Sequence, residues 1–153
     1  MLPIPINATI SLIPYTQTDE AAFSWYQNLR IQWLVSRLKR PYTRQEVNEM
    51  YHYQNCHGAL YYISDNGVLA GDVWLGREDF SIVIAPDHQQ KGIGTTVVTY
   101  FLKRLEQAGA KEMRVAEVYN YNAGSNRLFQ SLGFKRVKQA THNTYYYPFY
   151  SPK

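Results

Sequence analysis

The sequence predicts an α+β fold with a largely antiparallel sheet and helices on its faces, and three observations support this class. Stretches with strand-like alternation interchange with stretches of helical periodicity along the chain. A hairpin signal joins two strands in the first half, and a strand, a turn and an amphipathic helix follow one another in the middle. No repeat, low-complexity linker or composition break interrupts the 153 residues, so we expect a single domain over residues 1–153.

The amino-terminal part carries the signals of a strand followed by helices. Alternation from Thr9 to Leu12 predicts the strand, and apolar residues at helical spacing from Asp19 to Leu38 predict one or two helices. Thr43 and Glu46 form a capping box, in which each side chain satisfies a backbone N–H at the helix start. We therefore expect a further helix that runs to about Gln54.

A hairpin and a third strand follow these helices. Strands are expected at Ala59 to Ser64 and at Val68 to Leu75, because the Asn-Gly pair within Asp65-Asn66-Gly67 suits the positive dihedrals of a tight turn. The next strand, Phe80 to Ala85, ends at Pro86. Gly92 to Ala108 then shows the one-sided apolar pattern of an amphipathic helix. The remaining predicted elements are a strand at Met113 to Tyr119, a helix at Ala123 to Leu132 closed by Gly133, and strands at Phe134 to Val137 and Tyr145 to Tyr150.

Composition and charge disfavour several classes of function. The net charge of +4 suits an anionic ligand, but the 16 basic residues are scattered, which argues against a nucleic-acid surface. No apolar run is long enough to span a bilayer, and the prolines and missing basic region near the start argue against a signal peptide. The four histidines form no ligand pair on one helix face, so no metal is expected. A lone Cys56 favours a cytoplasmic location.

The turn Gln89-Gln90-Lys91-Gly92-Ile93-Gly94, between a strand and a helix, has the features of an anion site. Small residues let a phosphate approach the backbone, the free N–H groups of a helix start can hold its oxygens, and Lys91 adds a positive charge. Val97 stands where a dinucleotide fingerprint has its third glycine, so the pattern is not generic dinucleotide binding. Taken alone, the two glycines fit a tight turn and close packing equally well.

A second motif removes this ambiguity. The pattern Gln89-x-x-Gly92-x-Gly94 after Ile84-Ala85-Pro86 resembles the coenzyme A pyrophosphate loop of the GNAT acetyltransferase family. The run Asn122-x-x-Ser125-x-x-Leu128-Phe129-x-x-Leu132-Gly133-Phe134 resembles the downstream motif of the same family. The agreement covers roughly Gly71 to Val137 and is most like the ribosomal-protein and polyamine acetyltransferase branches.

The resemblance implies a fold, a donor and a reaction. The fold is a mixed, mostly antiparallel sheet of six to seven strands flanked by helices, with the cofactor in a V-shaped cleft. Acetyl-CoA is the implied donor, and the implied acceptor is a primary amine of a small molecule or of a peptide or protein N-terminus. The implied cofactor-binding residues are Ile82, Val83 and Ile84 on the strand, Gln89, Gln90, Lys91, Gly92, Ile93, Gly94 and Thr95 around the loop, and Asn122, Ser125 and Phe129 downstream.

Acetyl transfer to an amine needs a base, because an alkylammonium is almost wholly protonated at neutral pH. Glu117 lies five residues before Asn122, where the resemblance places a catalytic glutamate in one branch. Glu78 and Asp79 precede the strand that leads to the loop, and other branches place their base there. At most one of these two neighbours should face the cleft. Each carboxylate also fits a solvated charge at a strand end.

Phe129 departs from the family pattern, since many members carry at this position a tyrosine that protonates the leaving thiolate. A thiol with a pKa near ~8.5 gives a fair leaving group without this acid. Tyr121 or one of Tyr145, Tyr146 and Tyr147 is a candidate substitute, although packing explains these rings as well. Two alternatives stay open: a coenzyme A-binding regulatory module that lost its chemistry, and a basic nucleic-acid-binding domain.

The acceptor region implied by the resemblance is rich in aromatic residues and poor in carboxylates. Polyamines need several carboxylates, so this composition weighs against polyamine acceptors. The expected partners are an amine acceptor and, as one option, a second copy of the chain, with no nucleic acid and no membrane.

Overall fold

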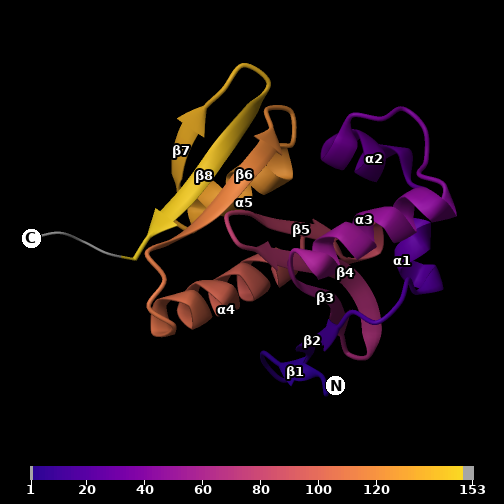
Figure 1. Cartoon of the computed structure of the whole chain (residues 1–153), viewed down its shortest axis with the longest axis horizontal. Helices are drawn as coiled ribbons and strands as arrows, with labels where there is room; N and C mark the ends of the chain where they lie inside the picture. The colour runs from indigo at the N-terminus through magenta and orange to yellow at the C-terminus, as the bar shows by residue number, and fades with distance from the viewer. Residues whose placement is uncertain (1, 150–153) are drawn as a thin grey trace, which may run out of the picture. The chain divides into compact units, whose positions relative to one another are not determined.

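The computed structural model describes residues 2–149, which form helices and antiparallel strands in two compact units (Figure 1). The first unit extends to Arg77 and includes Ser81–Ile93, and the second combines Glu78–Phe80 with the chain from Gly94 onward. The predicted α+β class is confirmed. Whether the chain is one domain remains a prediction.

A five-stranded sheet forms the framework of the first unit, with the order β1-β2-β3-β4-β5. The pairs β1–β2, β2–β3 and β3–β4 are antiparallel. At the predicted hairpin, Asn66 has φ 52° and Gly67 has φ 83°, the positive values that an Asn-Gly turn requires. The strands are β1 (Ile4–Pro5), β2 (Ile10–Pro14), β3 (Gly58–Asp65), β4 (Val68–Gly76) and β5 (Phe80–Ile84), of which β1 was not predicted.

Three α-helices and a short 3₁₀ helix, Pro86–His88, complete the first unit: α1 (Glu20–Trp25), α2 (Leu29–Ser36) and α3 (Arg44–Cys56). The predicted helical stretch from Asp19 splits in two because Asn28 caps a second helix by accepting the N–H of Ile31. Both hydrogen bonds of the predicted capping box at α3 are present. The Arg40 guanidinium and the Thr43 N–H hold the pKa of Glu46 at about 2.

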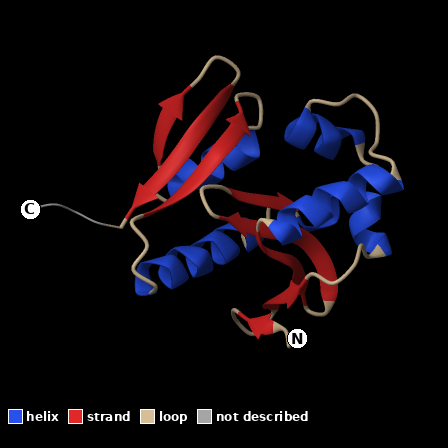
Figure 2. Ribbon diagram, viewed as in Figure 1, coloured by secondary structure: helices blue, strands red, loops and turns tan. Residues whose placement is uncertain are grey.

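Aromatic side chains dominate the core of the first unit, where α1 and α3 cover β3 and β4 (Figure 2). The Nε1–H group of Trp74 on β4 donates to the carbonyl of Gln54 on α3 over 2.8 Å. Burial of this apolar surface is the main stabilising contribution. The buried residues of the cluster are Ala22, Trp25, Tyr26, Ile31, Val47, Tyr51, Leu60, Tyr62, Trp74 and Ala85.

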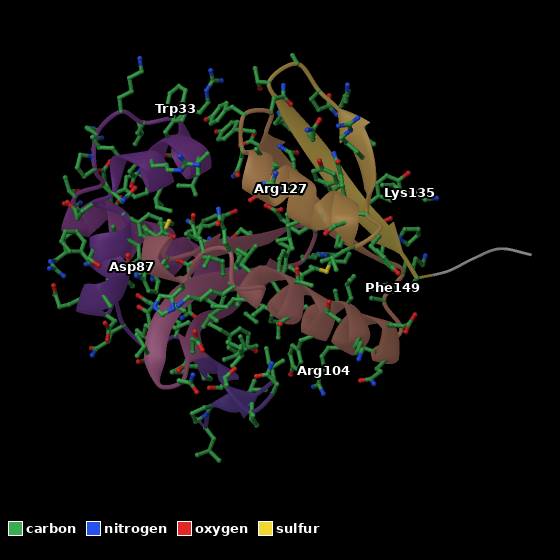
Figure 3. The ribbon with its side chains drawn as sticks, turned by 180° about the vertical axis from the view of Figure 1, so that it is seen from behind. Trp33, Asp87, Arg104, Arg127, Lys135 and Phe149 are labelled. Carbon is green, nitrogen blue, oxygen red and sulfur yellow. The ribbon has the colours of Figure 1, made fainter. Side chains whose placement is uncertain are left out.

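The second unit contains a three-stranded sheet with the order β6-β8-β7, in which both pairs are antiparallel. Phe129 of α5 packs against Phe134 and Tyr145 with ring centroids 5.1 and 5.6 Å apart, which holds α5 on the sheet. Arg127 and Lys135 lie on the exposed side of this unit (Figure 3). Its elements are α4 (Ile93–Gln107), β6 (Glu112–Tyr119), α5 (Ala123–Ser131), β7 (Lys135–Lys138) and β8 (His142–Pro148).

Two predictions about the strands need correction. Among residues 2–149 there are eight strands in two sheets, rather than six to seven in one, because β1 adds a strand and β5 and β6 belong to different sheets. The last strand begins at His142 instead of Tyr145, since residues 142–144 already pair with β6 and β7. Tyr150, its predicted end, lies outside the described residues.

Candidate active site

The predicted anion loop lies in the first unit as far as Ile93 and has an unusual backbone. Gln90 has φ 63° and Gly92 has φ 78°, so two left-handed residues flank Lys91 directly before α4. A Cβ at Gly92 would meet no atom within 4 Å, so it is the backbone conformation that requires glycine here. Backbone turns with left-handed residues direct successive N–H groups to one side, which is a common anion-binding geometry.

The strand before this loop is fixed by a close backbone approach. A Cβ on Gly71 of β4 would overlap the carbonyl oxygen of Val83 on β5, so only glycine allows this spacing. The N–H of Ala85 donates to the carbonyl of Ala70 over 2.7 Å, and Nε2 of Gln89 donates to the carbonyl of Ile84 over 3.0 Å. These contacts define the path of the chain from the predicted pantetheine strand into the loop.

His88 connects the loop to the β3–β4 turn. Its Nδ1 atom lies 3.6 Å from Oδ2 of Asp65, and both side chains are largely buried. The same Nδ1 atom has no hydrogen-bond partner within the described part of the chain. The contact is an ion pair when the imidazole is protonated.

The downstream motif lies in the second unit, at the start of α5. Asn122 is the N-cap of this helix, because its Oδ1 atom accepts the N–H of Ser125 over 3.2 Å. This cap occupies one of the two acceptor sites of Oδ1 and neither N–H of the amide Nδ2 group. Gly94, near the start of α4, has the Leu128 side chain 3.2 Å from where a Cβ would lie. Thr95, the remaining predicted cofactor residue, follows it on α4.

Phe129 and Tyr145 are core residues of the second unit. Phe129 is 2% exposed and Tyr145 is fully buried. The Tyr145 hydroxyl donates to Oδ1 of Asn126 over 2.6 Å and accepts from Nε2 of Gln130 over 3.0 Å. This hydroxyl is therefore engaged within the packing of the unit. Tyr121, another predicted substitute acid, is partly exposed and stacks on Tyr119 with centroids 5.5 Å apart.

The three candidate bases all lie in the second unit, in different surroundings. Oδ1 of Asp79 accepts the N–H groups of Phe80 and Ala116, each over 2.8 Å, so this carboxylate is engaged in hydrogen bonds to the backbone. Glu78 is exposed. Glu117 is half exposed, and its carboxylate lies 3.9 Å from Nδ1 of His142 on β8.

Glu117 lies within a bulge in β6 that the sequence did not predict. Val115 pairs with Tyr145 and Val118 with Asn143, so two residues of β6 oppose one residue of β8. Asp79 accepts the N–H of the bulged Ala116, and Thr144 donates its hydroxyl to the carbonyl of that residue over 2.8 Å. Bulges redirect the adjacent side chains and are frequent near active sites.

Asp72 is a buried carboxylate in the first unit that sequence reasoning missed. Its Oδ2 atom accepts the hydroxyl protons of Tyr26 at 2.6 Å and Tyr51 at 2.8 Å. Burial raises the pKa of Asp72 to about 6, against the lowering effect of these two hydrogen bonds. Burial, followed by the negative charge of Asp72, raises the pKa of both tyrosines well above 10. An aspartate within the apolar strand β4 was the available signal.

The predicted cofactor residues thus divide between the units. Within the first unit, the strand residues 82–84 and the loop residues 89–93 are consecutive parts of one path. Gly94, Thr95, Asn122, Ser125 and Phe129 belong to the second unit, as do the three candidate bases. Among the described residues, no group of three or more His, Cys, Asp or Glu side chains could hold a metal ion. No helix in residues 2–149 has the length and apolar character needed to cross a membrane.

Comparison with protein families gives a clear match. The model of the Acetyltransferase (GNAT) family matches residues 22–134, which is most of the chain. Both sequence motifs lie within the matched region. The first forms the loop before α4, and the second begins at the N-cap of α5. The chain therefore belongs to the GNAT family of acetyltransferases.

Curated relatives share about half of their length with this chain. The [ribosomal protein bS18]-alanine N-acetyltransferase of Escherichia coli is 35% identical over 69 residues, which cover 45% of this chain and 44% of that protein. The L-amino acid N-acyltransferase MnaT of E. coli is 32% identical over 80 residues, or 46% of each chain. Both similarities lie within the identity range of distant relatives.

A solved structure confirms the fold. The spermidine N-acetyltransferase of Vibrio cholerae, in complex with CoA and spermine, superimposes with a TM-score of 0.68. The alignment covers 93% of this chain and 96% of that one at 18% sequence identity. The predicted GNAT fold is therefore confirmed.

Proposed function

We propose that the chain is an N-acetyltransferase that moves the acetyl group of acetyl-CoA to a primary amine. The observation that carries this proposal is the pair of left-handed residues, Gln90 and Gly92, at the start of α4 in a member of the GNAT family. The V. cholerae structure with the same fold contains CoA, which supports the choice of donor. The N–H groups of this loop and the charge of Lys91 would hold the pyrophosphate.

Glu117 is the best candidate for the base. Asp79 already accepts two backbone N–H groups, whereas Glu117 is half exposed within a bulge and has an imidazole nearby. The amine nitrogen would attack the thioester carbonyl carbon directly while its proton passes to the Glu117 carboxylate. The C–S bond then breaks, the amide forms, and the CoA thiolate leaves and later takes up a proton. The thiolate is stable enough to leave without a tyrosine in place of Phe129.

The acceptor we propose is an α-amine, on a free amino acid or at a peptide or protein N-terminus. The names of the two curated relatives describe action on an alanine of ribosomal protein bS18 and on L-amino acids. An α-amino group has a pKa near ~8, which is lower than that of a lysine or polyamine amine. A carboxylate base can therefore deprotonate it more easily. A single-domain organisation, a cytoplasmic location and a homodimer remain expectations from the sequence.

A thiol-release assay over a panel of amines tests this function. We expect turnover with free L-amino acids or with peptides that begin in alanine or serine, and much slower turnover with spermidine. Spermidine as the best substrate would contradict the proposed acceptor class. Acetyl-CoA binding without turnover on any amine would instead favour the regulatory module, for which Phe129 in place of the family tyrosine is the specific supporting observation.

A further inference from the structure

The amide side chain of Asn126, on the first turn of α5, uses all of its hydrogen-bonding capacity. Its Nδ2 group donates to the carbonyls of Tyr119 at 3.0 Å and Asn122 at 2.8 Å, with that of Asn120 at 3.5 Å. Its Oδ1 atom accepts from Nδ2 of Asn143 at 2.9 Å and from the Tyr145 hydroxyl at 2.6 Å. An amide offers two donors and two acceptor sites, so this group is fully satisfied.

These bonds join three elements of the second unit. On one side Asn126 holds the turn that links β6 to α5, and on the other it is held by two residues of β8. The turn includes Asn122, whose own side chain caps α5 through Ser125. Fixing the carbonyls of Tyr119 and Asn122 therefore fixes the backbone from which the Asn122 side chain projects.

Asparagine has a low helix propensity, because its side chain competes for backbone groups. Residues that break a local rule without benefit to the helix tend to lie at functional sites. The two donors of an amide, facing two carbonyl oxygens, are what a carboxylate or an apolar side chain cannot supply.

We propose that Asn126 is a positioning residue for the cofactor: it sets Asn122 and the start of α5 for contact with the pantetheine arm, and Asn143 and Tyr145 brace it from β8. This inference rests on the proposed function. It also accounts for the buried Tyr145 hydroxyl, which donates its proton to Asn126 and is not the acid for the leaving thiolate.

Asn126→Asp is the sharpest test, because it keeps both acceptor bonds and replaces the donors with an oxygen that faces two carbonyl oxygens. We expect the KM for acetyl-CoA and the calorimetric Kd for CoA to rise about tenfold or more. This rise corresponds to the loss of binding free energy that one hydrogen bond contributes. The value of kcat at saturating acetyl-CoA should change by less than about threefold, since the acceptor and base are untouched.

Two matched variants separate positioning from stability. Tyr145→Phe removes one bond to Oδ1 of Asn126 but leaves its two donors on the turn carbonyls, so it should lower Tm and raise the KM for acetyl-CoA clearly less than Asn126→Asp does. Asn120→Asp adds the same charge to the same turn and should have no effect on KM, because the Asn120 side chain is directed to Ala140, whose carbonyl accepts from its Nδ2 group over 3.3 Å. If the Asn126→Asp chain does not fold, Asn126→Ser takes its place and must show the same rise in KM.

The proposal is overturned if a folded Asn126 variant binds CoA as tightly as the wild-type chain, or if Tyr145→Phe raises KM to the same extent. A wild-type chain that binds no CoA would instead refute the proposed function, so the two failures are distinguishable.

Discussion

Replacing Glu117 with glutamine is expected to lower kcat/KM for the amine about 100-fold near neutral pH, the usual contribution of a general base. Glutamine keeps the size and hydrogen-bonding reach of the side chain but cannot take a proton at this pH. The Glu117 side chain is half exposed in the β6 bulge, so the substitution should leave the fold intact. Initial rates across pH 6–10, with an α-amine acceptor, measure the effect.

The pH profile is the diagnostic part of this result. A rising pH deprotonates the amine in solution, so the base becomes less necessary and the deficit of the variant should shrink toward high pH. Glu112→Gln, on the same strand and also exposed, is the matched control and should retain the wild-type profile. If Glu117→Gln behaves like Glu112→Gln at every pH, Glu117 is not the base.

Asp72→Asn is expected to remove a large pH dependence from the stability of the chain. The pKa of Asp72 is about 6 in the folded chain and near the ordinary value of 3.8 when unfolded. The folded chain thus binds more protons between these values, so the contribution of Asp72 to stability is full below about pH 4 and is lost as the pH rises through 6. The loss amounts to about 3 kcal/mol.

Urea unfolding of both chains between pH 4 and pH 7 measures this effect. Between pH 4 and pH 7 the free energy of unfolding of the asparagine variant should rise by about 3 kcal/mol relative to that of the wild-type chain, because the asparagine side chain does not titrate. Asp87→Asn, at an exposed aspartate (Figure 3), is the control and should run parallel to the wild-type chain. If the free energies of unfolding of Asp72→Asn and wild type differ by the same amount at every pH, the pKa of Asp72 is not raised in the folded chain.

The fold was predictable wherever a few neighbouring residues determine the geometry. The Thr43–Glu46 capping box and the Asn66-Gly67 turn each depend on side chains within three positions, and both are present as expected. The start of β8 was missed because residues 142–144 lack an apolar alternation and pair with two strands that lie elsewhere in the sequence. The division into two sheets was missed because pairing between distant segments leaves no local pattern.

The candidate site, like the fold, was predictable only where neighbouring residues determine it. The loop residues were identified from spacing and resemblance, and the left-handed Gln90 and Gly92 fit the expected turn. Asp72 was missed because its partners lie 21 and 46 residues away in the sequence, and no local rule brings them together. Asp79 was considered as a base, but its acceptance of the Ala116 N–H depends on a residue 37 positions further on.

A calorimetric titration of the intact chain with acetyl-CoA tests the central claim most directly, with Gly92→Ala beside the wild type. A left-handed conformation costs alanine about 1–2 kcal/mol, so we predict one-to-one binding to the wild-type chain and about tenfold weaker binding to the variant. Gly109→Ala is the matched control, because Gly109 has φ 80° and equally open space, yet lies past the other end of α4. No binding to the wild-type chain, or equal weakening by the two glycine substitutions, would contradict an acetyl-CoA site at this loop.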